Sequence, residues 1–205
     1  MSKLQLTTSG INIKSPKGIA LWCNNIEPQR TFNPTGDLTT SLILDPNAED
    51  VKEMIAKLEA LRAEAFAEAK EKLGPAKAKG LQERPVYQPD TDKDGNETGK
   101  IVFKFKLGNV DTKKADGKQY QIRTYDAQTN RIDNPPRVGN GSEIRCTAFA
   151  NPYYMATSKE IGVSMYWQGM QIIKLVEIGG GDDFEAEEGY TIAPPTVEEN
   201  QEIPF

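Results

Sequence analysis

The sequence predicts a mainly β protein: a small Greek-key barrel of five or six antiparallel strands, capped by one long α-helix and followed by an acidic tail. Three observations support this prediction. Short stretches in which apolar and polar residues alternate recur between Gly- and Pro-rich breaks. One helical periodicity interrupts them at residues 48–73. Residues 179–205 hold eight acids and no base, so we predict a folded domain at 1–178 and a disordered tail at 179–205.

The charge is distributed unevenly along the chain. The 205 residues include 25 basic and 30 acidic side chains, for a net charge of −5. Without the eight tail acids, 22 acids remain against 25 bases, so the rest of the chain carries +3. A basic body with an acidic arm is typical of a protein whose groove binds polyanions. The chain has no histidine, which makes a hydrolase or a zinc enzyme a weaker hypothesis.

The sequence also predicts the compartment. The first residues lack the apolar run of a signal peptide, and no apolar stretch approaches the ~20 residues that span a bilayer. Cys23 and Cys146 lie in apolar-patterned strands, so we expect buried free thiols rather than a disulfide. We therefore expect a cytoplasmic protein without membrane contact.

The N-terminal part predicts two strands separated by a loop. The first strand, Lys17–Cys23, places Ile19 towards the core and Trp22 on the opposite face. Asn24–Gly36 is rich in Asn and Pro and predicts a loop. The second strand is expected at Leu38–Leu44.

Ala48–Leu73 predicts the long helix, because its apolar residues recur at helical spacing. Gly74 and Pro75 should end it. We favour packing of this helix as a cap on the sheet, with a coiled-coil dimer as the alternative.

A polar segment, Pro75–Gly99, follows the helix. Within it, Asp90–Gly95 matches the first half of an EF-hand calcium loop. The twelfth position should be Glu but is Ile101, and a strand rather than a helix is expected next. We therefore interpret Asp90–Asp94 as a solvated turn and predict no metal site and no cofactor.

The remainder of the chain predicts strands joined by loops. Asn151–Lys159 is interpreted as a loop that offers Tyr153 and Tyr154 to solvent. Gly162 and Gly169 mark bends in the last strand. The four predicted strands are Ile101–Leu107, Gln119–Tyr125, Glu143–Phe149 and Ile161–Ile178.

Basic and aromatic residues alternate on the polar faces of these strands. Single-stranded nucleic acid needs this combination, since cations follow the phosphates and rings stack on exposed bases. The plainer interpretation is that surface lysines block edge pairing and that tyrosines pack across strands. The strand positions are Lys104, Lys106, Arg123, Tyr125, Arg145, Phe149 and Tyr166, and Trp22, Arg30, Tyr153 and Tyr154 complete the candidate contacts.

Other classes of function find less support. The sequence contains no glycine-rich phosphate loop, nucleophile elbow or paired-carboxylate motif, so we expect a binding protein and discount a nuclease. The main alternative is a protein–protein adaptor, in which the barrel holds one partner and the acidic tail recruits another.

Several motifs together resemble one family, the single-stranded DNA-binding proteins of bacteriophages of the phage T7 type. The resemblance covers nearly the whole chain and rests on the order and spacing of the motifs. These are Phe32-Asn33-Pro34 with Gly36, Ala63–Ala67, Val102–Lys106, Gly139–Ser142, Pro152-Tyr153, Gly162–Ser164, Gly179–Phe184, Gly189-Tyr190 and the terminal Phe205.

This resemblance implies an oligonucleotide-binding (OB) barrel capped by a helix. It implies DNA contacts from Lys104, Lys106 and Tyr153 and a basic residue at Arg145. It further implies protection of single strands without strong sequence preference during phage replication, recombination and repair, in the cytoplasm of the infected bacterium. The chain departs from the family pattern in two places. Thr35 replaces a basic residue, for which Arg30 is a substitute, and Met155 replaces an aromatic one.

The tail tip is similar to that of bacterial single-stranded DNA-binding proteins. It ends in Glu202, Ile203, Pro204 and Phe205, an apolar hook beside acidic residues. The resemblance implies that the tip recruits replication proteins, such as a DNA polymerase, a helicase-primase or host repair proteins. The acidic tail is also expected to compete with DNA for the basic groove, and a homodimer is compatible with these features.

Overall fold

The structure is a computed structural model that describes residues 4–113 and 119–177. The predicted tail, 179–205, lies outside the described residues. One helix and ten strands make up this part of the chain. In chain order they are β1 (Ile11–Lys14), β2 (Gly18–Gln29), β3 (Asp37–Leu44), α1 (Glu49–Ala78), β4 (Gln82–Glu83), β5 (Gln88–Thr91), β6 (Glu97–Gly108), β7 (Arg123–Tyr125), β8 (Arg131–Ile132), β9 (Glu143–Met155) and β10 (Glu160–Lys174).

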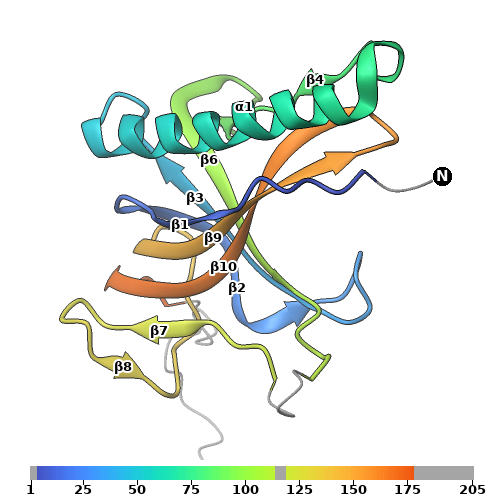
Figure 1. Ribbon diagram of the computed structural model, residues 1–205. Coiled ribbons are helices and arrows are strands. Elements are labelled where there is room, and N and C mark those ends of the chain that lie inside the picture. Colours follow the sequence, from blue (N-terminus) through green and yellow to red (C-terminus); the bar gives the residue numbers. More distant parts are fainter. Residues whose placement is uncertain (1–3, 114–118, 178–205) are drawn as a thin grey trace, which may run out of the picture.

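Five strands close a barrel in the order β2, β3, β6, β10 and β9, and β9 returns to pair with β2. This closed five-stranded Greek-key barrel is the architecture of an OB fold, as predicted. Among these five strands one pair departs from the antiparallel expectation, because β6 and β10 run parallel. Outside the barrel, β4 and β7 also pair parallel to β10. The hairpin of β7 and β8 lies at the end of the barrel away from α1 (Figure 1).

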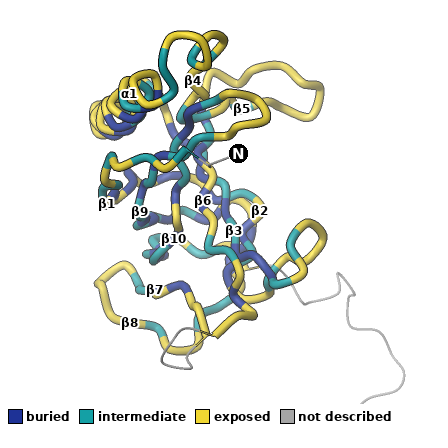
Figure 2. The backbone as a smooth tube through the Cα atoms, turned by 45° about the vertical axis from the view of Figure 1, so that its right-hand side comes forward, coloured by how far each residue is buried: buried dark blue, intermediate teal, exposed yellow. Residues whose placement is uncertain are grey.

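Helix α1 caps the barrel because its apolar residues form a single stripe. Val51, Met54, Leu58, Leu61 and Ala65 recur three or four positions apart and are all buried. Figure 1 shows the helix lying across one end of the barrel, between β3 and β6 in the chain. In Figure 2 the buried residues follow the barrel strands and the side of α1 that faces them.

The helix continues beyond its predicted end. Gly74 has a φ of 71° and interrupts the helical backbone, but a further helical turn runs to Ala78. Pro75 then occupies the first turn of this second piece, where a missing N–H costs little. The predicted breaker residues therefore produce a kink rather than a stop.

A β-bulge at Trp22 corrects the prediction for the first strand. Trp22 has a φ of 52°, and the register of β2 against β3 shifts between Leu21 and Asn24. Before the bulge Ala20 is buried and Ile19 is 40% exposed, so the prediction that Ile19 faces the core is wrong. The prediction that Trp22 faces outward is confirmed. Strand β2 also runs on to Gln29, through residues that were predicted to form a loop.

Strand β9 is longer than predicted. Pro152, Tyr153 and Tyr154 continue it to Met155 and pair with β10, so the prediction of a loop at Asn151–Lys159 is wrong for these residues. Strand β1 reaches only as far as Ala150, which leaves one edge of β9 free, and proline is tolerated at such an edge. The strand predicted at Gln119–Tyr125 is also shorter, since β7 begins at Arg123.

The two cysteines are free and buried, as predicted. Burial raises the pKa of the Cys23 thiol to about 11, although a hydrogen bond with Thr40 acts in the opposite direction. Burial also raises the pKa of the Cys146 thiol, so both thiols are neutral at physiological pH. Within the described residues, no helix is long and apolar enough to cross a membrane.

Replacement of Phe103 by alanine should destabilise the protein strongly. Phe103 is 1% exposed in the barrel core, and truncation of a buried phenylalanine typically costs ~3–5 kcal/mol of unfolding free energy. Phe32 is 88% exposed, so Phe32→Ala is a matched control that should change the unfolding free energy by less than about 0.5 kcal/mol. Urea denaturation measures both. Equal stability of the two variants would contradict the assignment of the core.

Candidate nucleic-acid interface

A continuous row of outward-facing residues crosses the barrel surface. Thr39 on β3 pairs with Lys106 on β6, and Lys106 pairs with Tyr166 on β10. Tyr166 pairs with Phe149 on β9, and Phe149 pairs with Asn12 on β1. Neighbouring strands lie ~4.8 Å apart, so these five residues span roughly 20 Å. We call this set the outer row.

Strict alternation along β6 turns the lysines outward. Phe103 and Phe105 are buried in the core, whereas Lys104 and Lys106 are exposed. This confirms the predicted assignment of the two pairs to opposite faces. Lys104 lies opposite Ser41 and makes no ion pair with any residue in the described ranges.

Lys106 is already paired within the molecule. Its Nζ lies 2.6 Å from Oδ2 of Asp37, a carboxylate that is largely buried. Burial raises the pKa of Asp37, but hydrogen bonds from Lys106 and Asn33 outweigh it and hold the pKa below its usual range. Asp37 is therefore ionised at neutral pH and holds the ammonium group beside the outer row.

Asn24 continues the outer row onto β2, and Trp22 lies two residues before it, at the bulge. The Trp22 side chain is 72% exposed, and its backbone adopts the left-handed region, which a bulky residue rarely occupies. The carbonyl oxygen of the Asn140 side chain accepts a hydrogen bond of 2.7 Å from the Trp22 amide. Asn24 Nδ2 donates to Thr39 Oγ1 over 3.3 Å and so links this bulge to the row. A strained backbone that displays an exposed indole is typical of a functional position.

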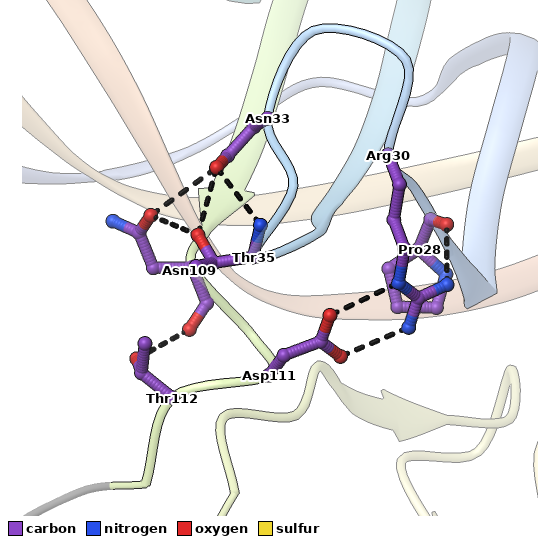
Figure 3. Close-up of polar contacts among 7 residues, drawn as sticks. All are labelled: Pro28, Arg30, Asn33, Thr35, Asn109, Asp111 and Thr112. Carbon is purple, nitrogen blue, oxygen red and sulfur yellow. Dashed lines mark hydrogen bonds and ion pairs between the residues drawn. The ribbon is translucent and has the colours of Figure 1, made fainter.

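The loop between β2 and β3 is fixed by polar contacts (Figure 3). Arg30 makes a bidentate ion pair with Asp111, at 3.0 and 2.9 Å. Thr35 Oγ1 hydrogen-bonds to the side-chain oxygens of Asn33 and Asn109, both at 2.7 Å. The hydrogen bonds with Asp111 raise the pKa of Arg30. Arg30, predicted as a DNA contact, thus serves first to brace this loop.

Phe32, at the tip of the same loop, is 88% exposed. We did not predict it as a contact residue, although an aromatic ring inside an Asn-, Pro- and Gly-rich loop was a usable signal. Thr39 was also missed, and the alternation of its strand indicates its outward position.

The two tyrosines of β9 face opposite sides of the strand. Tyr153 lies across from Gly162, where an added Cβ would come within 2.5 Å of the tyrosine oxygen, so only glycine leaves room for the ring. Tyr154 instead packs against Ala65 and Ala69 of α1. The prediction that Tyr154 is offered to solvent is therefore corrected: in this structure it is a packing residue, while Tyr153 remains a candidate contact.

Two of the predicted basic residues lie away from the outer row. Arg145 is four residues, about 13 Å, along β9 from Phe149. It lines a cavity of about 340 Å³ together with Asp50 and Glu53 of α1. Arg123 and Tyr125 lie on β7, where Tyr125 pairs with Gln171 of β10.

The described residues hold no group of three or more Cys, Asp or Glu side chains that could bind a metal ion. In the turn at Asp90–Asp94, the Asp92 carboxylate accepts hydrogen bonds from the amides of Asp94 and Asn96, both 2.9 Å. The Asp92 carboxylate therefore stabilises the turn through hydrogen bonds to its own backbone.

Comparisons with known proteins point to one family. The sequence model of the family "Single-stranded DNA-binding protein, Bacteriophage T7" matches residues 23–177. The single-stranded DNA-binding protein of Escherichia phage T7 is 26% identical over 161 residues, which cover 76% of this chain and 69% of that protein. Its counterpart from Enterobacteria phage T3 is 26% identical over 189 residues, covering 89% and 82%.

Solved structures show the same fold. The crystal structure of the phage T7 protein has a TM-score of 0.65 at 21% identity and covers 90% of this chain and all of that one. The protein of bacteriophage Enc34, solved in complex with single-stranded DNA, has a TM-score of 0.53 at 10% identity and covers 85% and 96%.

Acrylamide quenching should separate the two tryptophans. Trp167 is fully buried, whereas Trp22 is 72% exposed, so acrylamide should quench only the Trp22 emission. The Trp22→Phe variant should therefore keep a blue-shifted emission that acrylamide barely reduces. Trp167→Phe is the reciprocal control, provided that it folds. Strong residual quenching in a folded Trp22→Phe variant would contradict the exposure of Trp22 described above.

Proposed function

This chain belongs to the bacteriophage T7 family of single-stranded DNA-binding proteins, and from that premise we propose that its outer row binds single-stranded DNA without strong sequence preference. The observation that carries the proposal is the adjacency of exposed Lys106 and Tyr166 on paired strands, with Lys104 on the same face. Cations beside exposed rings suit a flexible strand whose bases are unpaired.

Each residue class has a distinct part in the proposed binding. Lys104 and Lys106 contact phosphates and release counterions, a contribution that does not depend on sequence. The rings of Trp22, Tyr166 and Tyr153 stack on bases, at ~1–3 kcal/mol per base. Every base presents a π face, so stacking also tolerates all sequences.

Asp37 sets the strength of the Lys106 contact. To bind a phosphate, the Lys106 ammonium group must either leave the Asp37 carboxylate or contact both anions at once. Because Asp37 is largely buried, leaving its carboxylate unpaired would be costly, so the ammonium group keeps this partner while it contacts a phosphate. The carboxylate meanwhile keeps the lysine in position before the strand arrives.

The proposed biological role is that of an accessory in phage DNA replication, recombination and repair. Coating would protect transient single strands and remove hairpins inside the infected bacterial cell. The binding itself needs no metal ion and no nucleotide cofactor, since phosphate contacts and stacking supply the affinity.

We further propose a double role for the acidic tail, residues 179–205. Its eight acidic residues are complementary to the positive face that carries Lys104 and Lys106. A segment tethered to the same chain reaches an effective concentration of roughly millimolar and can compete with DNA. DNA binding would then release Glu202–Phe205, which recruits replication proteins.

Titration of the intact protein with oligo-dT at several salt concentrations tests the binding proposal. The logarithm of the affinity should fall linearly with the logarithm of salt concentration, by ~0.7 per phosphate contact. A protein–protein adaptor with an apolar interface would show little salt dependence. Absence of saturable oligo-dT binding would exclude the proposal.

The double variant Lys104→Ala with Lys106→Ala should bind all oligonucleotide sequences more weakly. Loss of two phosphate contacts should also flatten the salt slope by about 1 to 2 units. Lys77→Ala with Lys79→Ala is the matched control, because these lysines are also exposed and two positions apart but lie at the far end of α1. If the two double variants bind alike, the outer row is not the binding face.

Deletion of residues 182–205 should raise the affinity for oligo-dT, most of all at low salt, because it removes all eight acidic residues of the tail. Deletion of Phe205 alone should leave DNA affinity nearly unchanged but impair binding of a replication partner, since a terminal aromatic anchor dominates a small interface. Both variants are measured in both assays. Unchanged DNA affinity after the longer deletion would rule out competition by the tail.

A further inference from the structure

A cavity of about 510 Å³ lies beside the β7–β8 hairpin, which Figure 1 shows at the end of the barrel away from α1. It lies between the far end of β2, the start of β3, and the β7–β8 hairpin. Leu38, Val110 and Ile122 contribute buried apolar surface to its lining. This volume is within the range of small-molecule sites, and the lining combines the apolar floor with polar and charged side chains.

The charges around this cavity are only partly neutralised. Three arginines line it. Arg30 is paired with Asp111, and Arg131 lies 3.3 Å from Asp133. Arg123 forms no ion pair within the described residues, and only its Nε donates, to the Gln168 carbonyl at 3.5 Å. Its remaining N–H groups are suited to an anion, phosphate above all.

A second, independent feature is the Thr124 hydroxyl. Thr124 lines the cavity and is 2% exposed, yet its Oγ1 has no hydrogen-bond partner among the described residues. A buried polar group without a partner costs about 1–3 kcal/mol, and such groups in native proteins call for an explanation. A ligand that donates or accepts a hydrogen bond at this wall would supply the missing partner.

The cavity adjoins the outer row on two sides. Leu38 pairs with Leu107, the residue after Lys106. Arg123 pairs with Gly169, three residues or about 10 Å along β10 from Tyr166. A strand that crosses Lys106 and Tyr166 therefore passes close to two residues that line the cavity, Leu38 and Arg123.

We propose that this cavity binds a single nucleotide, with the planar base on the apolar floor and the phosphate at Arg123. The inference rests on the proposed function in one respect: we take the nucleotide to be one unit of the bound strand. Its base leaves the stacking side chains of the outer face and enters the cavity. A free nucleoside monophosphate has the same chemistry, and the experiment separates the two sources.

Thymidine monophosphate, titrated into the intact protein and followed by amide chemical shifts, tests the proposal. We expect saturable shifts at Arg123, Thr124 and Ile122. Arg123→Ala should weaken this binding at least tenfold. Arg84→Ala removes the same charge from an exposed site beside α1 and should leave it unchanged.

Thr124→Val provides a second variant that removes only the hydroxyl. It should weaken mononucleotide binding severalfold while the protein keeps or gains stability, since an unpaired buried hydroxyl is lost. The two lysine substitutions at Lys104 and Lys106 should leave mononucleotide binding intact, because neither residue lines the cavity.

Competition with oligo-dT separates the sources. If oligo-dT displaces the mononucleotide and Arg123→Ala weakens both ligands, the site holds a unit of the strand. If both ligands bind together and Arg123→Ala affects only the mononucleotide, the site holds a free nucleotide. Normal oligo-dT binding without saturable mononucleotide shifts, or equal affinity in Arg123→Ala and Arg84→Ala, would overturn the cavity proposal while the proposed function stands.

Discussion

The parallel pairing of β6 with β10 is the constraint on which the candidate site depends. This pairing closes the barrel and places Lys106 next to Tyr166. Because side chains alternate along each strand, closure that buries Phe105 and Met165 must also turn Lys106 and Tyr166 outward together. The apolar core therefore fixes the arrangement of the polar face, and a shift of one residue in this register would bury the lysine.

The barrel also determines which basic side chains are already paired with a carboxylate and which are unpaired. Lys106 is paired with Asp37 on β3, and Arg30 is paired with Asp111, just after the end of β6. Lys104 and Arg123 have no such partner among the described residues. The paired cations hold the outer row and the β2–β3 loop in place, while the unpaired ones are the groups with most to gain from a phosphate. This division explains how one face is both ordered and receptive to a polyanion.

Local patterns predicted much of this structure, and long-range pairing determined the remainder. Alternation in Ile101–Leu107 correctly separates the lysines from the phenylalanines, and helical spacing correctly places α1. The bulge at Trp22 was not predictable, since it depends on the register against β3. Tyr154 packs on a helix that lies about 90 residues earlier in the chain, and Arg30 pairs with Asp111, 81 positions away. No local pattern carries those contacts.

The most direct test of the central claim is to map where a bound strand touches the protein. Oligo-dT that carries a photoreactive thymidine analogue is cross-linked to the intact protein, and the modified residues are identified by mass spectrometry. If the outer row binds the strand, adducts should form at aromatic residues of the outer barrel face, Trp22, Tyr166 and Tyr153. Adducts confined to aromatic residues outside this face, such as Phe66 and Tyr87, would contradict the assignment, since both pack against the hydrophobic core clusters and neither belongs to the outer row.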